Sequence, residues 1–256
     1  MTKIDTFESI TCEYNTGSIP PPFCHRYKIE ITRSKSRTLQ IGLNLEYYDR
    51  DEINEEEIFD EGFSLNDDFS WKGALPEIWE KEITEKLKST NWRKKLSTNQ
   101  DGSEFSIKIV SKDKTEILQP ADTRIWENFC QEIIQAVFEL GEKEAPLFIS
   151  YVHKLSGHHM DQVDFEYSFA NRKIHIISPK NRQKSMEWVE GQQLLKYIYN
   201  LDYLPENGYE VIPKKQGNYI SPGDGLWYEL SQKNNVGNST NEKIKKLVDK
   251  LNTYLI

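Results

Sequence analysis

Cysteine is scarce in this chain, and the few cysteines present form no motif. The 256 residues include Cys12, Cys24 and Cys130, and no two of them are spaced as Cys-x-x-Cys. An odd, widely spaced set provides neither a disulfide framework nor a pattern of zinc ligands. The scarcity favours a reducing compartment, so we expect a cytoplasmic protein.

Long apolar runs and a secretory leader are also lacking. No stretch approaches the roughly 18 apolar residues that span a bilayer, and Met1 to Asp5 shows no basic segment followed by an apolar one. Apolar residues nevertheless make up 37% of the chain and aromatic residues 12%, which is more than a disordered chain carries. We therefore expect a soluble globular protein that does not contact membranes.

A polar segment near the middle of the chain is the best candidate for an internal boundary. Residues 97–103 contain no apolar side chain, while a length of 256 residues suits one large domain. The expected organisation is a single globular domain over 1–256, with possible subdomains 1–96 and 104–256 joined by the polar loop 97–103.

An excess of positive charge is missing as well. The chain has 33 Lys and Arg against 41 Asp and Glu, a net charge of −8. A general binder of nucleic acids or anionic membranes would need a broad cationic face. Neither is therefore expected as a partner.

Charge is nonetheless concentrated in two places. Residues 49–61 hold eight acids against the single Arg50, and we expect this run to form a strand or a solvated loop. Further along, five cations follow one another with no acid between them: Arg172, Lys173, Lys180, Arg182 and Lys184. Each feature is typical of a solvated face. Together they form two poles of opposite charge. Such poles favour either a salt-sensitive contact with a protein partner or head-to-tail self-association into an oligomer. The predicted contact residues are Asp51, Glu55, Glu56, Glu57 and the five cations.

Alternation of apolar and polar residues predicts paired strands. It runs over 23–31 and 39–47, again over 105–109, and over 163–169 and 173–177, while 147–152 is an apolar run typical of a central strand. Helical spacing predicts helices at 79–87, from Asp122 to Gly141, over 183–200, and after the capping box Ser239-x-x-Glu242. Strands in hairpins followed by helices favour an α+β fold with a mainly antiparallel sheet backed by about four helices.

A cluster of imidazoles and carboxylates suggests metal chemistry. His158, His159 and Asp161 precede Asp164 and Glu166, and such side chains bind divalent metals in hydrolytic enzymes. However, adjacent histidines on an extended chain point to opposite sides. A polar loop that leads into a half-exposed strand explains the same residues without a metal.

The same segment resembles, in part, the restriction-type nucleases. Those enzymes place an acid on one strand and an acid-x-Lys pair on the next, in some members with a Gln-x-x-x-Tyr helix. Asp161 or Asp164, then Lys173, then Gln193 and Tyr197 match that order. The position two before Lys173 is Asn171, so one metal-binding carboxylate of the family is missing. The resemblance implies a metal-dependent hydrolase or nuclease acting through Asp161, Asp164, Glu166 and Lys173.

Other catalytic patterns are incomplete. Cys24 and His25 are neighbours on a predicted strand and cannot hydrogen-bond each other, so His25 is expected to be a core histidine, on the apolar face, bonded to a backbone group. Cys130 lies on the apolar stripe of a predicted helix. No Gly-x-Ser-x-Gly elbow is present, and the glycine-rich segment 217–225 leads into a predicted strand instead of a phosphate-binding helix. An ordinary long turn is the expected structure there.

Three functional hypotheses follow from these patterns. The first is a non-enzymatic interaction protein, such as an adaptor, an inhibitor or an immunity-type module, that binds another protein and needs no cofactor. The second is the hydrolase or nuclease, with a divalent metal held by His158, His159 and Asp161. The third is a small-ligand sensor whose pocket is closed by residues 217–225.

Overall fold

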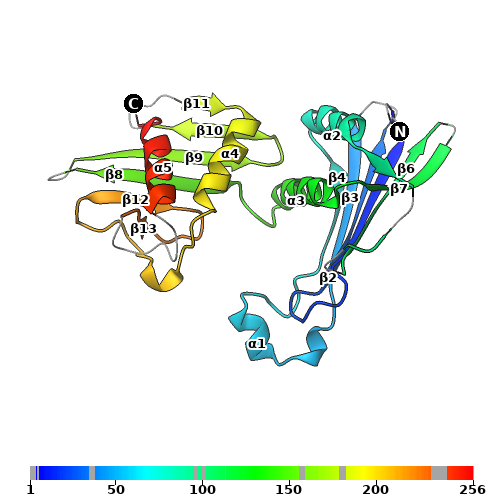
Figure 1. Cartoon of the computed structure of the whole chain (residues 1–256), viewed down its shortest axis with the longest axis horizontal. Helices are drawn as coiled ribbons and strands as arrows, with labels where there is room; N and C mark the ends of the chain where they lie inside the picture. The colour runs from blue at the N-terminus through cyan, green and yellow to red at the C-terminus, as the bar shows by residue number, and fades with distance from the viewer. Residues whose placement is uncertain are drawn as a thin grey trace. The chain divides into compact units, whose positions relative to one another are not determined.

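Two antiparallel sheets form the framework of the fold (Figure 1). The computed structural model describes residues 4, 6–34, 38–94, 97–99, 102–112, 114–155, 159–178, 183–231 and 241–255. Contacts between Cα atoms divide the chain into two units, Met1–Glu144 and Ala145–Ile256. This division lies at residues 144 and 145 and not in the polar segment 97–103, because the strands on either side of that segment belong to one sheet.

The first unit contains a seven-stranded sheet with strand order β4-β3-β2-β1-β6-β7-β5. Its strands are β1 (Ser9–Asn15), β2 (His25–Arg33), β3 (Leu39–Tyr47), β4 (Phe69–Ala74), β5 (Trp92–Arg93), β6 (Glu104–Ser111) and β7 (Lys114–Pro120). Its helices are α1 (Glu55–Asp60), α2 (Ile78–Ser89) and α3 (Thr123–Leu140), with a 3₁₀ turn at Arg50–Glu52.

Alternation along the strands gives the first sheet one apolar face. Ile29 and Ile31 of β2 are buried, and so are Leu43 of β3 and Ile107 of β6. Helices α2 and α3 supply the other half of this core through Trp79, Ile83 and Leu87 and through Trp126, Phe129, Ile133 and Val137. The opposite face of the sheet carries polar and charged side chains and lies open to water.

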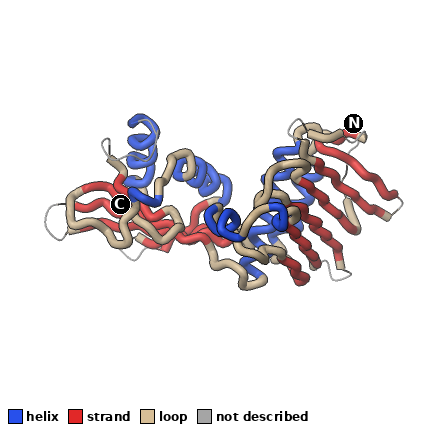
Figure 2. Tube along the Cα trace, turned by 90° about the horizontal axis from the view of Figure 1, so that it is seen from below, coloured by secondary structure: helices blue, strands red, loops and turns tan. Residues whose placement is uncertain are grey.

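The second unit repeats this layering with a six-stranded sheet of order β11-β10-β9-β8-β12-β13. Its strands are β8 (Leu147–Lys154), β9 (Met160–Ser168), β10 (Lys173–Ile177), β11 (Gln183–Met186), β12 (Gly217–Ser221) and β13 (Tyr228–Glu229). Its helices are α4 (Trp188–Ile198) and α5 (Asn241–Asn252), with a 3₁₀ turn at Pro205–Asn207. Figure 2 shows the larger helices of each unit gathered on one side of its strands.

The α+β class and the mainly antiparallel pairing are confirmed. β2 pairs with β3 and β9 with β10, as the alternation predicts, and β8 is a central strand. Helix α3 begins after Asp122, whose side chain accepts a hydrogen bond from the Arg124 backbone N–H, and ends at Gly141. Ser239 lies outside the described residues, so the structure is silent on its capping box.

Four local expectations are wrong. Phe23 precedes β2 and is 43% exposed. The acidic run forms a 3₁₀ turn and a helix, not a strand or loop. Residues 183–186 form the edge strand β11, so helix α4 begins only at Trp188 and leaves Val189 exposed. Segment 217–225 begins with strand β12, because its alternating residues extend the ladder of β8. Strands β1, β4, β5 and β7 have no counterpart among the sequence predictions.

None of the described helices is both long enough and apolar enough to cross a membrane.

Candidate functional site

The acidic run forms an ordered projection between β3 and β4, which we call the acidic tip (residues 49–68). Helix α1 is capped by Asn54, whose side chain accepts a hydrogen bond from the Glu57 backbone N–H at 2.9 Å. Its first turn holds three glutamates, Glu55 to Glu57, whose negative charges stabilise the positive end of the helix dipole. Ile58 is its buried residue. Figure 1 shows α1 in cyan beyond the ends of the strands.

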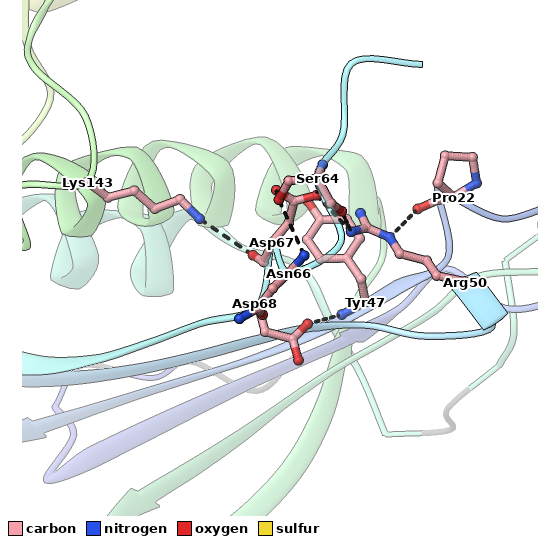
Figure 3. Close-up of polar contacts among 8 residues, drawn as sticks. All are labelled: Pro22, Tyr47, Arg50, Ser64, Asn66, Asp67, Asp68 and Lys143. Atoms are coloured by element: carbon pink, nitrogen blue, oxygen red, sulfur yellow. Dashed lines mark hydrogen bonds and ion pairs between the residues drawn. The ribbon is translucent and has the colours of Figure 1, made fainter. Parts of the chain in front are cut away.

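Arg50 fixes the base of the acidic tip (Figure 3). Its Nε donates to the Pro22 carbonyl at 3.3 Å, and its Nη1 donates to the Ser64 carbonyl and to Asp67 Oδ2, both at 2.7 Å. The guanidinium also lies 4.1 Å from the centre of the Tyr47 ring. Since the Arg50 side chain is only 10% exposed, these contacts are shielded from water and join three separate segments of the tip and its surroundings.

Further contacts link the tip to the sheet and to the end of α3. The Phe63 ring meets the Phe23 ring edge-on, with centroids 5.5 Å apart. The Tyr47 backbone N–H donates to Asp68 Oδ1 at 2.8 Å. Lys143, just beyond α3, lies 5.0 Å from the Phe69 ring centre and reaches the Asp67 carbonyl at 3.5 Å. The acidic tip is therefore held as a fixed element.

Acidification is expected to remove the contribution of Asp67 to the stability of the first unit. Burial alone would raise the pKa of Asp67, but hydrogen bonds from Ser64 and the Arg50 guanidinium outweigh it and hold the pKa below its usual value. A carboxyl with a lowered folded-state pKa stabilises the fold above its unfolded pKa, about 3.9, and loses this effect as the pH falls through the folded value.

The free energy of unfolding of Asp67→Asn should therefore lie about 1 kcal/mol below wild type at neutral pH and equal it in strong acid. Urea titrations at the two pH values measure both differences. An equal difference at both would show that the charge of Asp67 is not what stabilises the tip.

The outward surface of the acidic tip combines carboxylates with apolar side chains. The predicted contact residues Asp51, Glu55, Glu56 and Glu57 are all exposed. On the same tip, the apolar side chains of Phe59 and Leu65 are 51% and 54% exposed. Outside residues 49–61 the chain has 32 Lys and Arg and 33 Asp and Glu, so this short run carries seven of the eight net negative charges.

The described cations of the predicted basic patch are not gathered on one face. Lys180 and Arg182 lie outside the described residues. Lys184 pairs with Ile176 on the helix-covered face of the second sheet, whereas Lys173 pairs with Ser168 on the opposite face. The Arg172 guanidinium lies over the Trp188 ring, 4.8 Å from its centre. In the part of the chain that the structure describes, the basic pole is therefore dispersed.

The predicted nuclease residues are only partly brought together. Asp164, Glu166 and Lys173 share the face of the second sheet opposite its helices, but Asp161 lies on the helix-covered face because strand side chains alternate. Asp164 Oδ1 accepts hydrogen bonds from Ser150 Oγ at 2.7 Å and from Gln162 Nε2 at 2.8 Å.

The predicted metal ligands are not brought together in the described part of the chain. His159 is exposed, and His158 lies outside the described residues. Within the described ranges, no group of three or more His, Cys, Asp or Glu is placed to hold a metal.

The remaining candidate sites are occupied by structural contacts. The Cys24 thiol donates to the Ile19 carbonyl at 2.6 Å, and burial raises its pKa, which is typical of an unreactive thiol. His25 Nδ1 lies 2.9 Å from the Phe23 carbonyl oxygen, as the predicted backbone bond requires, but the residue is half-buried and not part of the core. In segment 217–225, Pro222 accepts a hydrogen bond from Tyr199 Oη at 2.7 Å.

Two groups in the structure have no counterpart in the sequence predictions. One is Arg50, whose only sequence signal is that it is the single base in the acidic run. The other is a polar network in the second unit, where Asn218 Oδ1 lies 2.6 Å from His153 Nδ1 and accepts from Tyr151 Oη at 2.9 Å. No motif marks it, because β8 and β12 are far apart in the sequence.

No family model, curated protein or solved structure matches this chain.

Proposed function

We propose that this chain is a non-enzymatic interaction protein whose acidic tip binds a basic surface of a protein partner. The observation that carries the proposal is the concentration of the net charge on one ordered, exposed element. Binding of this kind suits an adaptor, an inhibitor or an immunity-type module. A cytoplasmic setting fits its three free, buried thiols.

The composition of the tip supports both fast association and stable contact. Clustered carboxylates speed the encounter with a cationic partner and favour one orientation. Phe59 and Leu65 supply apolar area that is buried only when a partner covers it. Because the Arg50 contacts hold the tip in place before binding, little ordering cost opposes association.

Neutralising the tip is expected to abolish the capture of such a partner. The test compares wild type with Glu55→Gln/Glu56→Gln/Glu57→Gln as tagged bait in nuclease-treated host lysate. A matched control, Glu85→Gln/Glu206→Gln/Glu210→Gln, removes the same number of charges from exposed sites elsewhere. Recovered proteins are identified and quantified by mass spectrometry.

A stoichiometric basic protein that is recovered by wild type and control, and reduced at least about tenfold by the tip variant, is the expected result. Equal recovery by all three baits would overturn the role of the tip. Recovery that disappears after nuclease treatment would instead indicate a complex mediated by nucleic acid and contradict the proposal.

A further inference from the structure

Strand β4 begins directly after the acidic tip and forms one end of the first sheet. It pairs only with β3 in the strand order, so its outer edge has no neighbouring strand among the described residues. The strand is six residues long, and Ser70, Lys72 and Ala74 are exposed. An exposed edge of this length can receive an added strand.

The ladder shows which backbone groups face outward. The Leu75 N–H donates to the Leu39 carbonyl, and the Tyr48 N–H donates to the Cys24 carbonyl of the preceding segment. Odd-numbered residues of β3 therefore bond toward β4, and even-numbered ones bond toward β2. In an antiparallel pair the bonding positions alternate, so the N–H and C=O groups of Ser70, Lys72 and Ala74 point away from β3.

The helix-covered face of β4 fits an added strand, whereas the opposite face carries the cation Lys72 beside Ser70 and Ala74. Phe69 and Trp71 are half-buried on the helix-covered face, where apolar side chains from a neighbouring strand would extend the core layer. Trp71 lies against Gly73, which leaves no room for a side chain there. The other face of β4 is polar, and the strand starts beside Asp67 and Asp68 of the tip.

We propose that the partner contributes an extended basic segment that pairs with the outer edge of β4 while its cations contact the acidic tip. This inference rests on the proposed function and names the binding mode. The segment has apolar side chains next to Phe69 and Trp71, on alternate positions, and lysine or arginine where it passes Asp67, Asp68 and the tip, away from Lys72. Charge on the tip selects the segment, and backbone hydrogen bonds to Ser70, Lys72 and Ala74 hold it.

The test uses a short peptide of alternating lysine and valine as the probe. Lys72→Pro removes an outward N–H and blocks the edge, yet costs no bond to β3. Lys72→Ala loses the same side chain but keeps the N–H, so it is the matched control. Affinity for the full chain is measured by fluorescence anisotropy, and circular dichroism confirms that each variant is folded.

The peptide should bind Lys72→Ala at least about tenfold more tightly than Lys72→Pro. A second arm keeps the wild-type protein and methylates every peptide amide nitrogen, which should weaken binding by a similar factor while the charge is unchanged. The comparison of methylated and unmethylated peptides tests the proposal even if Lys72→Pro does not fold.

Equal binding to both Lys72 variants, no loss on methylation, or no binding of the peptide to wild type would overturn strand addition. If binding is then still lost in the tip variant Glu55→Gln/Glu56→Gln/Glu57→Gln, the acidic tip remains the docking site by another mode. If Lys72→Pro instead dissociates a dimer seen in sedimentation and leaves peptide binding unchanged, the edge serves a second copy and the proposal is wrong.

Discussion

Trp126→Ala is expected to lower the free energy of unfolding of the first unit by about 4 kcal/mol, the range for deleting a fully buried aromatic side chain. The Trp126 side chain is 1% exposed, and its ring centroid lies 5.6 Å from that of Phe129 and 5.7 Å from that of Trp92. Its Nε1 also donates to Thr90 Oγ1 at 2.8 Å. Alanine therefore leaves a cavity between α3 and the end of α2. The Thr90 hydroxyl loses the hydrogen bond that it accepts from Trp126 and keeps the one that it donates to the Lys86 carbonyl.

The neighbouring Ile125 provides the control on the same helix. Because Ile125 is 52% exposed, Ile125→Ala should change the free energy of unfolding by less than about 0.5 kcal/mol. Chemical denaturation followed by circular dichroism measures both variants. Similar losses for the two would mean that the packed face of α3 is assigned incorrectly.

Arg50→Met should lower the free energy of unfolding by about 3 kcal/mol. Methionine keeps an apolar stem against the Tyr47 and Phe63 rings, but it removes the donors to Pro22, Ser64 and Asp67. The Asp67 carboxylate, 25% exposed, then lacks its cation. We also expect the tip to lose its fixed position, which would weaken partner capture even though every glutamate is retained.

Arg26→Met is the matched control, since Arg26 forms a comparable pair with Glu46 at 2.6 Å but with a side chain that is 61% exposed. An exposed pair contributes less than about 1 kcal/mol. Urea titration separates the two variants. If Arg26→Met were as destabilising as Arg50→Met, burial of Arg50 would not explain the stability of the tip.

The antiparallel sheets could be predicted because their cores leave a period-two pattern in the sequence. Ile29 and Ile31 alternate with Lys28 and Glu30, and burial of one face follows the same alternation. Helix α3 was equally predictable, since its apolar stripe is wide and Asp122 caps it. The residues that determine these elements lie within the elements themselves.

The acidic tip could not be predicted in this way. Helix α1 has a single buried residue, Ile58, and therefore no apolar periodicity. Its position depends on Arg50, whose partners Pro22 and Asp67 are 28 and 17 residues away. Segment 183–186 was predicted wrongly for a related reason: among residues 184–186, whose side chains the structure describes, one is buried, Met186, so the short strand resembles the start of the helix that follows.

The charged residues of the candidate site could be predicted from the sequence, but the helix and the Arg50 contacts that hold them could not. Asp51, Glu55, Glu56 and Glu57 were predicted from charge alone and are exposed in the structure. The paired role assigned to Arg172, Lys173 and Lys184 has less support, because their side chains are spread over different faces of the second unit. Folding makes the acidic pole compact and leaves the described part of the basic pole dispersed.

Amide hydrogen exchange of the full chain, alone and with its captured protein partner, tests the central claim most directly. Binding through the acidic tip predicts slowed exchange in residues 49–68 and in β4, with exchange in the second sheet unchanged. Slowed exchange confined to the second unit, with residues 50–74 unaffected, would contradict the account.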